Sequence, residues 1–446
     1  MEPAISALDA LLTPPPRPAR HRGRRRLKQR LVAAAHELGP GVVTGAADDD
    51  PSGIATYSQA GAQFGYGLLW TMLLTFPLMS AVQLVSAHIG RVTGQGLARN
   101  LTAAFPKLTV LFLLGILVVA NMINIGADLS AMGASAELVV GGGRHWFVLG
   151  FAVASVLLQL FVPYHHYARI LKWMTLSLFA YVGVLLVVHT DWTAAIRGMV
   201  WPSVLNGPAV LTIVALFGTT ISPYLFFWQS AQEAEEIVDT PGGRPLKEAP
   251  RTAKRQFRRM RIDTIVGMAF SNLISITIIL ATAATLNAHG LTQINTAAEA
   301  AEALRPIAGR FAFLLFATGI IGTGLLAVPV LAGSAAFAVS EAGNWKRGLE
   351  YMPAQALRFY GLIAGATLVG MAFDWVSIDP VKALFWSAVL NGLAAVPLMV
   401  AMMILVGRRS VMGRFTAAPS LLLFGWAATG VMGAAAAALL VQAAMG

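Results

Sequence analysis

The stretch that decides the fold is GAADDDPSGIATYSQAGAQFG, residues 45–65. Three consecutive carboxylates, residues 48–50, are followed by Pro51, Ser52 and Gly53 inside a run of otherwise small or apolar residues. Inserting an Asp at bilayer depth costs about 2.5–3.5 kcal/mol on insertion scales, so a continuous lipid-facing helix would not carry this sequence. Because Pro51 removes a backbone donor and Gly53 frees the backbone, we expect a helix that is interrupted here inside a bundle and exposes carbonyl groups.

The rest of the chain has the composition of a membrane protein. Of its 446 residues, 57% are hydrophobic and only 12% are charged, which is too apolar for a soluble enzyme of this length. Its apolar runs reach roughly 20 residues, the length that spans the hydrocarbon region. They lack the alternation expected of β-barrel strands. We therefore predict an all-α protein with eleven spans, at about residues 38–65, 67–90, 109–138, 146–163, 168–189, 206–236, 261–286, 310–341, 354–373, 382–406 and 417–443.

The distribution of basic residues predicts the orientation. With a cytoplasmic amino terminus, 27 of the 32 Lys and Arg residues lie on the cytoplasmic side, as the positive-inside rule requires. We therefore expect a multi-pass protein of the bacterial inner membrane, with a disordered basic tail over residues 1–34. The net charge of +11 comes from short segments flanking apolar spans, which favours contact with lipid headgroups over nucleic-acid binding. The absence of cysteine excludes disulfides and thiolate ligands.

A second interruption lies in the sixth predicted span, FGTTISPYLFFWQSAQEAEE, residues 217–236. Its Pro223 follows three hydroxyl residues within five positions. Spans one and six each begin a unit of five helices, and matched interruptions in two inverted halves indicate a transporter with its binding site near the midplane of the membrane. We expect a first repeat over residues 35–190, a second repeat over residues 205–406 and an eleventh helix over residues 417–443.

Several motifs in this order resemble the Nramp family of metal transporters. They run from about Gly39 to the end of the tenth span. The resemblance implies a LeuT-type fold and the transport of a divalent metal ion as cargo, with no resident cofactor and no enzymatic activity. The motifs are DPSG at residues 50–53, QLVSAHIGRVTGQGL at 83–97, GADLSA at 126–131, GTTISPY at 218–224 and DTIVGMAFSN at 263–272.

The sequence departs from the family pattern at the expected metal ligands. The family has Asp-Pro-Gly-Asn in the first span, and Gly53 stands here in place of the ligand Asn. The family's Met-Pro-His in the sixth span is replaced by Ser222, Pro223 and Tyr224, so both the thioether and the imidazole are missing. A thioether favours late transition metals, whereas magnesium needs hard oxygen ligands and keeps several of its waters. These changes shift the predicted cargo toward magnesium.

We therefore predict a magnesium site, which also admits manganese, formed by oxygen groups at the two helix breaks together with trapped water. The small residues Gly53 and Ser222 leave room for a hydrated ion. Asn272 on the seventh span would complete the shell, although an amide that bridges two helices is an equal alternative. The predicted metal residues are Asp50 through its carboxylate, Ala47 and Thr219 through backbone carbonyls, Ser222 through its hydroxyl, Gly53 and Asn272, and the predicted break residues are Pro51, Ser52 and Pro223.

The resemblance also implies altered proton coupling. The family's proton route uses the first-span Asp, an Asp and a Glu on the third span, and the sixth-span His. Asp128 matches, but Ala131 stands at the Glu position and Tyr224, a phenol that ordinarily titrates at about pH 10, stands at the His position. We predict weak or absent proton coupling, with the cation driven by the membrane potential. The predicted pathway residues are Asp48, Asp49, Asp128, Tyr224 and Asn391.

Some alternatives stay open at this point. Asp128 is equally explained as an anchor hydrogen-bonded to Asn124, and Asp48 and Asp49 either hold cations at the inner mouth or are solvated when the site opens. The carboxylates at residues 233–236 are expected to form a solvated helix end. The rival functions are a proton-coupled manganese or iron importer and a carrier of an amino acid or amine on the same fold. A monomer is expected.

Overall fold

Helices form all the regular secondary structure of the described part of the chain. The computed structural model describes residues 44–45, 47–162, 176–202, 204–240, 242–349, 351–375 and 379–445. Within these ranges there is no strand. Nine helical segments there are long and apolar enough to cross a membrane, and a tenth, Leu176–Val187, is shorter. The predicted all-α architecture of a multi-pass membrane protein is confirmed, whereas the predicted tail over residues 1–34 lies outside the described residues.

The long helices fall at the predicted spans. The division into repeats at residues 35–190 and 205–406, the orientation and the monomeric state stay predictions. The helices of the first five spans are α4 (Pro51–Phe64), α5 (Leu69–Thr93), α7 (Lys107–Val140), α8 (Arg144–Phe161) and α10 (Phe179–Val187), and those of the later spans are α12 (Gly207–Thr220) with α13 (Pro223–Asp239), α14 (Ala253–Thr285), α17 (Ala312–Ala342), α18 (Leu357–Ala372), α19 (Pro380–Gly407) and α21 (Pro419–Met445).

Both predicted helix breaks are present. The helix α4 begins at Pro51, and Asp50 is its N-cap, with the carboxylate accepting a hydrogen bond from the Gly53 amide at 2.8 Å. In the sixth span, α13 likewise begins at a proline, Pro223, directly after Ser222. Proline suits the first position of a helix, where its missing N–H has no partner to lose, and it disrupts a helix interior. Each proline therefore starts a new half-helix within the bundle.

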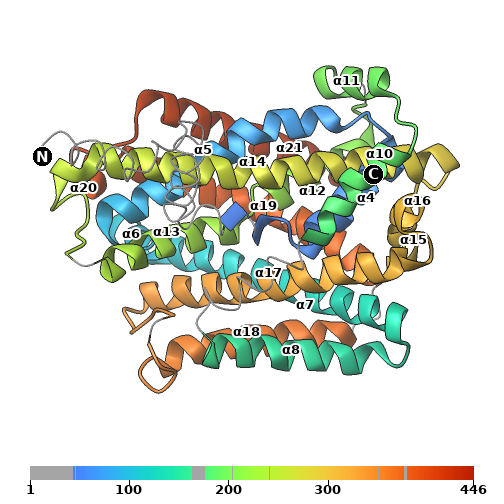
Figure 1. Ribbon diagram of the computed structural model, residues 1–446. Helices are drawn as coiled ribbons and strands as arrows, with labels where there is room; N and C mark the ends of the chain where they lie inside the picture. The colour runs from blue at the N-terminus through green and yellow to red at the C-terminus, as the bar shows by residue number, and fades with distance from the viewer. Residues whose placement is uncertain are drawn as a thin grey trace, which may run out of the picture. The chain divides into compact units, whose positions relative to one another are not determined.

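Small residues allow the helices to approach closely around the breaks. In Figure 1, α7 and α17 lie side by side, and α8 and α18 form a layer against them. The helix α4 packs on α14, and α12 packs on α19. A Cβ on Gly45 would lie 2.4 Å from the backbone of Gly267, and a Cβ on Gly218 would lie 2.0 Å from the carbonyl oxygen of Ala388. These contacts need glycine, as is common between membrane helices.

A short helix, α6 (Leu97–Ala104), occupies the segment predicted as the loop after the second span. Its N-cap is Gly96, which has no side chain to accept a hydrogen bond from the first turn. Those amides are satisfied from distant helices, because Leu97 donates to Ser230 Oγ at 2.9 Å and Arg99 donates to Glu341 Oε2 at 3.1 Å. Further helices between predicted spans are α11 (Trp192–Val200), α15 (Ala297–Ala301), α16 (Arg305–Ala308) and α20 (Arg409–Met412).

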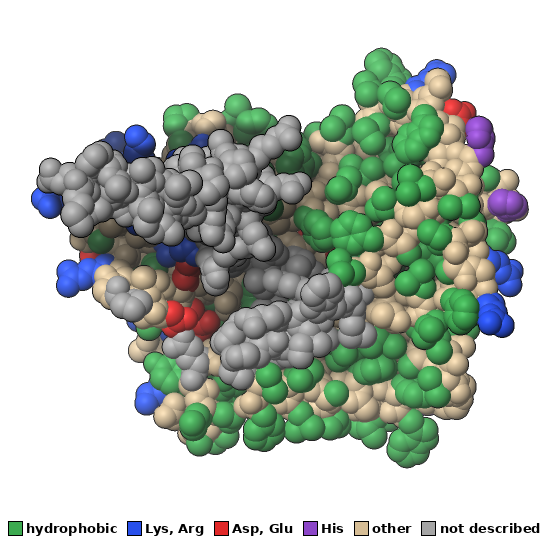
Figure 2. Space-filling view, viewed as in Figure 1, with side chains coloured by type: hydrophobic (Ala, Val, Ile, Leu, Met, Phe, Trp, Pro, Cys, Tyr) green, Lys and Arg blue, Asp and Glu red, His purple; other side chains and the backbone are tan. Residues whose placement is uncertain are grey.

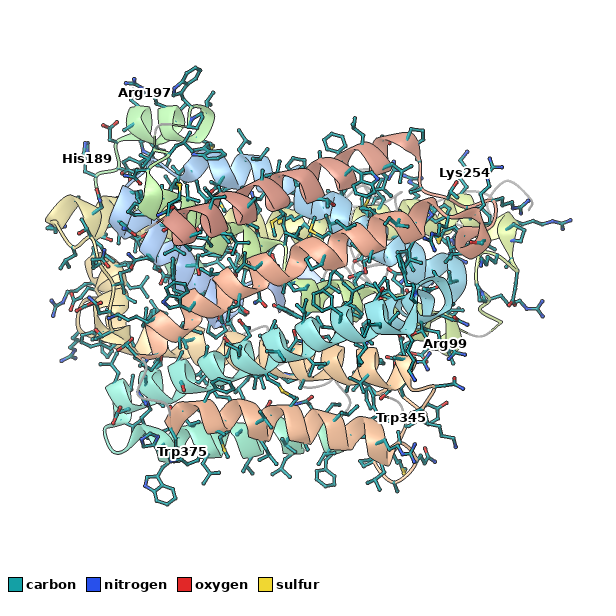
Figure 3. All side chains as sticks on the ribbon, turned by 180° about the vertical axis from the view of Figure 1, so that it is seen from behind. Arg99, His189, Arg197, Lys254, Trp345 and Trp375 are labelled. Carbon is teal, nitrogen blue, oxygen red and sulfur yellow. The ribbon has the colours of Figure 1, made fainter. Side chains whose placement is uncertain are left out.

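The two ends of the bundle differ from its flank. Figure 2 shows apolar side chains over the flank and charged side chains gathered toward the ends. Figure 3 places Arg99, Lys254 and Trp345 at one end, and His189 and Arg197 at the other. We call the first of these the basic end. An apolar flank between polar ends is the surface expected of a protein that lies across a bilayer.

Candidate metal site

Asp50 lies at the start of α4 with both carboxylate oxygens hydrogen-bonded. Its Oδ1 accepts from the Ser52 hydroxyl at 2.6 Å and from the Gly53 amide, and its Oδ2 accepts from Asn124 Nδ2 at 3.0 Å. The residue is 1% exposed. No Lys, Arg or His of the described ranges forms a salt bridge with it. The carboxylate is held in place by neutral donors, so its negative charge is left for a cation.

Asn124 on α7 joins the first, third and tenth spans. Its Nδ2 contacts Asp50 Oδ2 and, at 3.4 Å, Asp128 Oδ2, while its Oδ1 accepts from Asn391 Nδ2 at 3.3 Å. Asp128 therefore makes the contact with Asn124 that is expected if it serves as a structural anchor. Asn391 bridges α19 to α7. Asn124 was not among the predicted site residues. The available signal was its position four residues before Asp128, on the same face of a helix.

Asp48 and Asp49 are two further buried carboxyl groups, and both contact α14. Asp48 Oδ2 and Asp49 Oδ1 lie 2.6 and 3.0 Å from the hydroxyl oxygen of Ser271. The two residues are 0% and 3% exposed, so they are not solvated in this conformation. A serine hydroxyl has one proton and can donate it to only one of the two carboxyl groups. Two buried carboxyl groups that face one serine hydroxyl therefore concentrate acidic oxygens in this part of the site.

The break in the sixth span presents a hydroxyl to the break in the first. Ser222 Oγ lies 2.9 and 2.8 Å from the carbonyl oxygens of Gly218 and Thr219 and can donate its one proton to either, so the predicted Thr219 carbonyl has a donor within the protein. The Thr219 hydroxyl oxygen, by contrast, has no hydrogen-bond partner among the described residues. A Cβ on Gly53 would lie 3.1 Å from that oxygen and 3.5 Å from Asp50 Oδ1. Gly53 therefore lies directly between the two breaks, where a side chain would be in tight contact with Thr219.

Tyr224 and Asn272 complete the surroundings of the breaks. The Tyr224 hydroxyl donates to the Ala47 carbonyl at 3.0 Å and is fully buried. One lone pair of the predicted Ala47 ligand is therefore occupied and the other is left. Asn272 follows Ser271 on α14, is 7% exposed, and its Oδ1 has no partner within the described ranges.

Unpartnered oxygens characterise this region. Buried polar atoms are normally hydrogen-bonded, so these unpartnered oxygens are the groups available to contact water or an ion. Among the described residues no group of three or more His, Cys, Asp or Glu side chains could hold a metal ion. The arrangement therefore combines the oriented carboxylate of Asp50 with further carboxyl groups and neutral oxygens. The unpartnered atoms are Asp48 Oδ1, Asp128 Oδ1, Thr219 Oγ1, Asn272 Oδ1 and Asn391 Oδ1.

The expectation of a solvated helix end at residues 233–236 is wrong for Glu233. This residue is 1% exposed, and its Oε2 lies 2.5 Å from a guanidinium nitrogen of Arg91 on α5. Its Oε1 accepts from Gln229 Nε2 at 3.1 Å. Arg91 also pairs with Glu236, which in turn pairs with Arg259 on α14 at 2.7 Å. The counter-charge from the second span is what allows Glu233 to be buried.

The fold and the broken helices together define a multi-pass membrane protein with a LeuT-type fold. Two helices broken at neighbouring positions, with a buried carboxylate and free oxygens at the breaks, form the binding region of such proteins. The fold is similar to that of an Eremococcus coleocola manganese transporter, with a TM-score of 0.68 at 17% sequence identity, covering 90% of this chain and 85% of that chain. It is also similar to Mhp1, a nucleobase-cation-symport-1 family transporter, with a TM-score of 0.53 at 11% identity, covering 91% and 93%.

Within that class the chain belongs to the Nramp family of divalent metal transporters. Residues 41–442 match the family described as natural resistance-associated macrophage protein-like. The divalent metal cation transporter MntH of Yersinia pestis (strain Pestoides F) is 26% identical over 382 residues, which cover 84% of this chain and 87% of that protein. The MntH protein of Mycobacterium leprae (strain TN) is 24% identical over 416 residues, 89% of each chain. The predicted resemblance and the predicted fold are confirmed.

Proposed function

We propose that this transporter moves magnesium, and also manganese, across the membrane by alternating access, with weak or no proton coupling. The single observation that carries the proposal is the oxygen-only character of the groups at the two breaks. Ser222 and Tyr224 occupy the positions where the family pattern has a thioether and an imidazole, and both are buried at the break. Hard oxygen ligands suit magnesium and manganese, whereas sulfur and nitrogen ligands favour later transition metals.

The hydrogen bonds around Asp50 favour an ion that keeps part of its water. Three donors already occupy this carboxylate, so it has few lone pairs left for direct contact. The nearby hydroxyl of Thr219 and amide oxygen of Asn272 have no protein partner in the described part of the chain. Magnesium dehydrates reluctantly and usually contacts protein through one or two carboxylates while it keeps several waters. Asp50 with water-bound neutral oxygens fits that requirement.

Two features support the proposal of weak proton coupling. The Tyr224 hydroxyl is engaged with the Ala47 carbonyl, and a phenol releases its proton only at high pH. The amide of Asn124 lies between the carboxylates of Asp50 and Asp128, and an amide does not titrate in the physiological range. A proton that left Asp50 toward α7 would therefore meet no titratable neighbour before Asp128.

The nearest rival is a proton-coupled manganese importer. It is favoured by the description of the Eremococcus coleocola structure as a manganese transporter. Manganese also accepts oxygen ligands, so the site chemistry alone admits it. The two functions differ in whether millimolar magnesium is carried or competes and in whether protons enter with the metal.

Transport into liposomes that contain the purified full chain tests the proposal. Magnesium and manganese uptake would be followed with metal-sensitive dyes, and the internal pH would be followed in parallel. We expect uptake of both ions at a stable internal pH, and no uptake with Asp50→Ala. Asp191→Ala is the matched control, because Asp191 caps α11 through the same kind of hydrogen bond, to the Ala194 amide at 2.9 Å, far along the chain from both breaks.

Three results would contradict the proposal. Manganese uptake that millimolar magnesium neither accompanies nor inhibits would remove the magnesium assignment. Proton influx that scales with metal flux would remove the uncoupled mechanism. Full transport by the Asp50→Ala variant would show that the ion binds elsewhere.

A further inference from the structure

A groove lies on the flank of the bundle between α5, α14 and the start of α21. Its volume is about 580 Å³, and none of its lining residues belongs to the ion site. Ile265 and Phe424 in its wall are 37% and 46% exposed, so the groove opens to whatever surrounds the helices. The apolar part of its wall includes Phe76, Leu84, Ile265, Leu421 and Phe424.

One end of the groove carries two guanidinium groups. Arg261 and Arg414 both line it, and both are exposed. In the part of the chain that the structure describes, neither forms a salt bridge with a carboxylate. A short apolar trough that ends in two unpaired cations is complementary to a ligand with an apolar chain and an anionic head.

The two arginines lie where the headgroup layer is expected. From Arg261 to the end of α14 the only other charged residue is Asp263, and these 24 helical steps are about 36 Å long at about 1.5 Å per residue. That length spans a hydrocarbon core of about 30 Å, so Arg261 marks one boundary of it. Arg414 comes five residues before α21 begins at Pro419, so a second spanning helix starts at the same groove.

Aromatic contacts hold the polar end of the groove in place. The His88 ring stacks on Phe257 with centroids 4.7 Å apart, and His88 Nε2 lies 2.7 Å from the Phe415 carbonyl oxygen. The Arg414 guanidinium lies over the Phe415 ring, 5.1 Å from its centroid. Deeper in the wall, Ser80 is 6% exposed and its hydroxyl has no hydrogen-bond partner among the described residues. The rim is ordered before any ligand binds, which lowers the entropy that binding would cost.

We propose that this groove is a specific binding site for one anionic phospholipid. The phosphate contacts Arg261 and Arg414, and one acyl chain lies along the wall formed by α5, α14 and α21. A zwitterionic lipid offers the same phosphate, but its own cation would lie near the two guanidinium groups and weaken the contact. Nothing in this inference depends on which ion the transporter carries.

Native mass spectrometry of the delipidated full chain tests the proposal. The protein would be titrated with phosphatidylglycerol and, separately, with phosphatidylcholine of the same acyl chains. Each basic contact with an anionic headgroup is worth about a factor of five, so we expect the double variant R261A/R414A to bind phosphatidylglycerol about 25-fold more weakly. The matched control is R255A/R258A, which removes the same charge from α14 at two exposed positions outside the groove. Thermal unfolding would verify that both variants are folded.

The apolar half of the site has its own test. Leu84→Trp enlarges a half-buried wall residue into the groove and leaves both arginines in place. We expect it to weaken binding of long-chain phosphatidylglycerol by tenfold or more and to leave the dihexanoyl form nearly unchanged. Equal weakening by R261A/R414A and R255A/R258A would show only general charge attraction. Equal affinity for the two headgroups, or no effect of Leu84→Trp, would also overturn the proposal, the last by showing a phosphate site without a chain.

Discussion

Replacing Arg91 by methionine would leave Glu233 buried without its counter-charge. Breaking a buried ion pair by removing one partner costs about 3–5 kcal/mol. Glu233 keeps the hydrogen bond from Gln229 at 3.1 Å, and Glu236 keeps Arg259, so the loss falls mainly on one carboxylate. We therefore expect Arg91→Met to lower the free energy of unfolding by about 3 kcal/mol, the lower end of that range.

The double variant R91M/E233Q separates lost charge pairing from lost packing. It removes both charges, and the glutamine amide retains the shape of Glu233. Neutral replacement of both members of a buried pair is often harmless, so we expect the double variant to recover about 2 kcal/mol relative to Arg91→Met alone. Denaturant titration in mixed micelles, followed by tryptophan fluorescence, would measure each unfolding free energy.

The double-mutant cycle at Arg91 and Glu233 distinguishes a stabilising ion pair from independent side chains. A coupling of about 2 kcal/mol or more, obtained from Arg91→Met, Glu233→Gln and the double variant, supports a buried pair that holds α13 to α5. Additive effects would refute it, as would an Arg91→Met variant within about 0.5 kcal/mol of the parent, the usual range of surface substitutions. Lys254→Met is the control, because Lys254 is an exposed basic residue of α14 with no salt bridge in the described structure.

Three further predictions concern the site and its packing. Ser222→Met introduces a soft ligand, so cadmium should outcompete magnesium by tenfold or more relative to the parent in liposome uptake; unchanged ion preference would contradict the oxygen-only argument. Asn124→Ala leaves a buried oxygen of Asp50 without its donor, which costs about 1–3 kcal/mol, and we expect transport to fall while the protein stays monodisperse in size-exclusion chromatography. Gly218→Ala would place a methyl group 2.0 Å from a backbone carbonyl, so it should destabilise the fold by about 1–3 kcal/mol in thermal unfolding, whereas Gly115→Ala, with no atom within 4 Å, should not.

Local chemistry made the membrane architecture and both helix breaks predictable. Apolar length and the cost of charge in lipid identify membrane spans without knowledge of their neighbours. Pro51 and Pro223 determine where two helices restart, because proline suits the first position of a helix wherever that helix packs. The same cost indicated a site at the three carboxylates of residues 48–50, and the resemblance to the family's Asp-Pro motif selected Asp50 among them.

The identity of the free oxygens was decided only by the tertiary structure. The sequence pointed to Thr219 through its carbonyl, yet the carbonyl is occupied by Ser222 and the hydroxyl is the group without a partner. Asn124 became a site residue because it contacts Asp50, which lies 74 positions earlier in the chain. Which side chains on different helices form hydrogen bonds depends on how each helix is rotated and packed, and the local sequence pattern does not specify either.

The burial of charged groups was likewise decided by the tertiary structure and could not be predicted from the sequence. The sequence by itself determined that Glu233 follows a helix break near the basic end, and a carboxylate in that context is normally solvated. Only the fold brings Arg91, 142 positions away, within 2.5 Å of it, and the first-turn amides of α6 likewise find their acceptors on α13 and α17. A segment's own residues determine whether it can be a helix in lipid. A buried charge or an uncapped helix end is stable only if a partner from a distant part of the chain packs against it, and that depends on the whole fold.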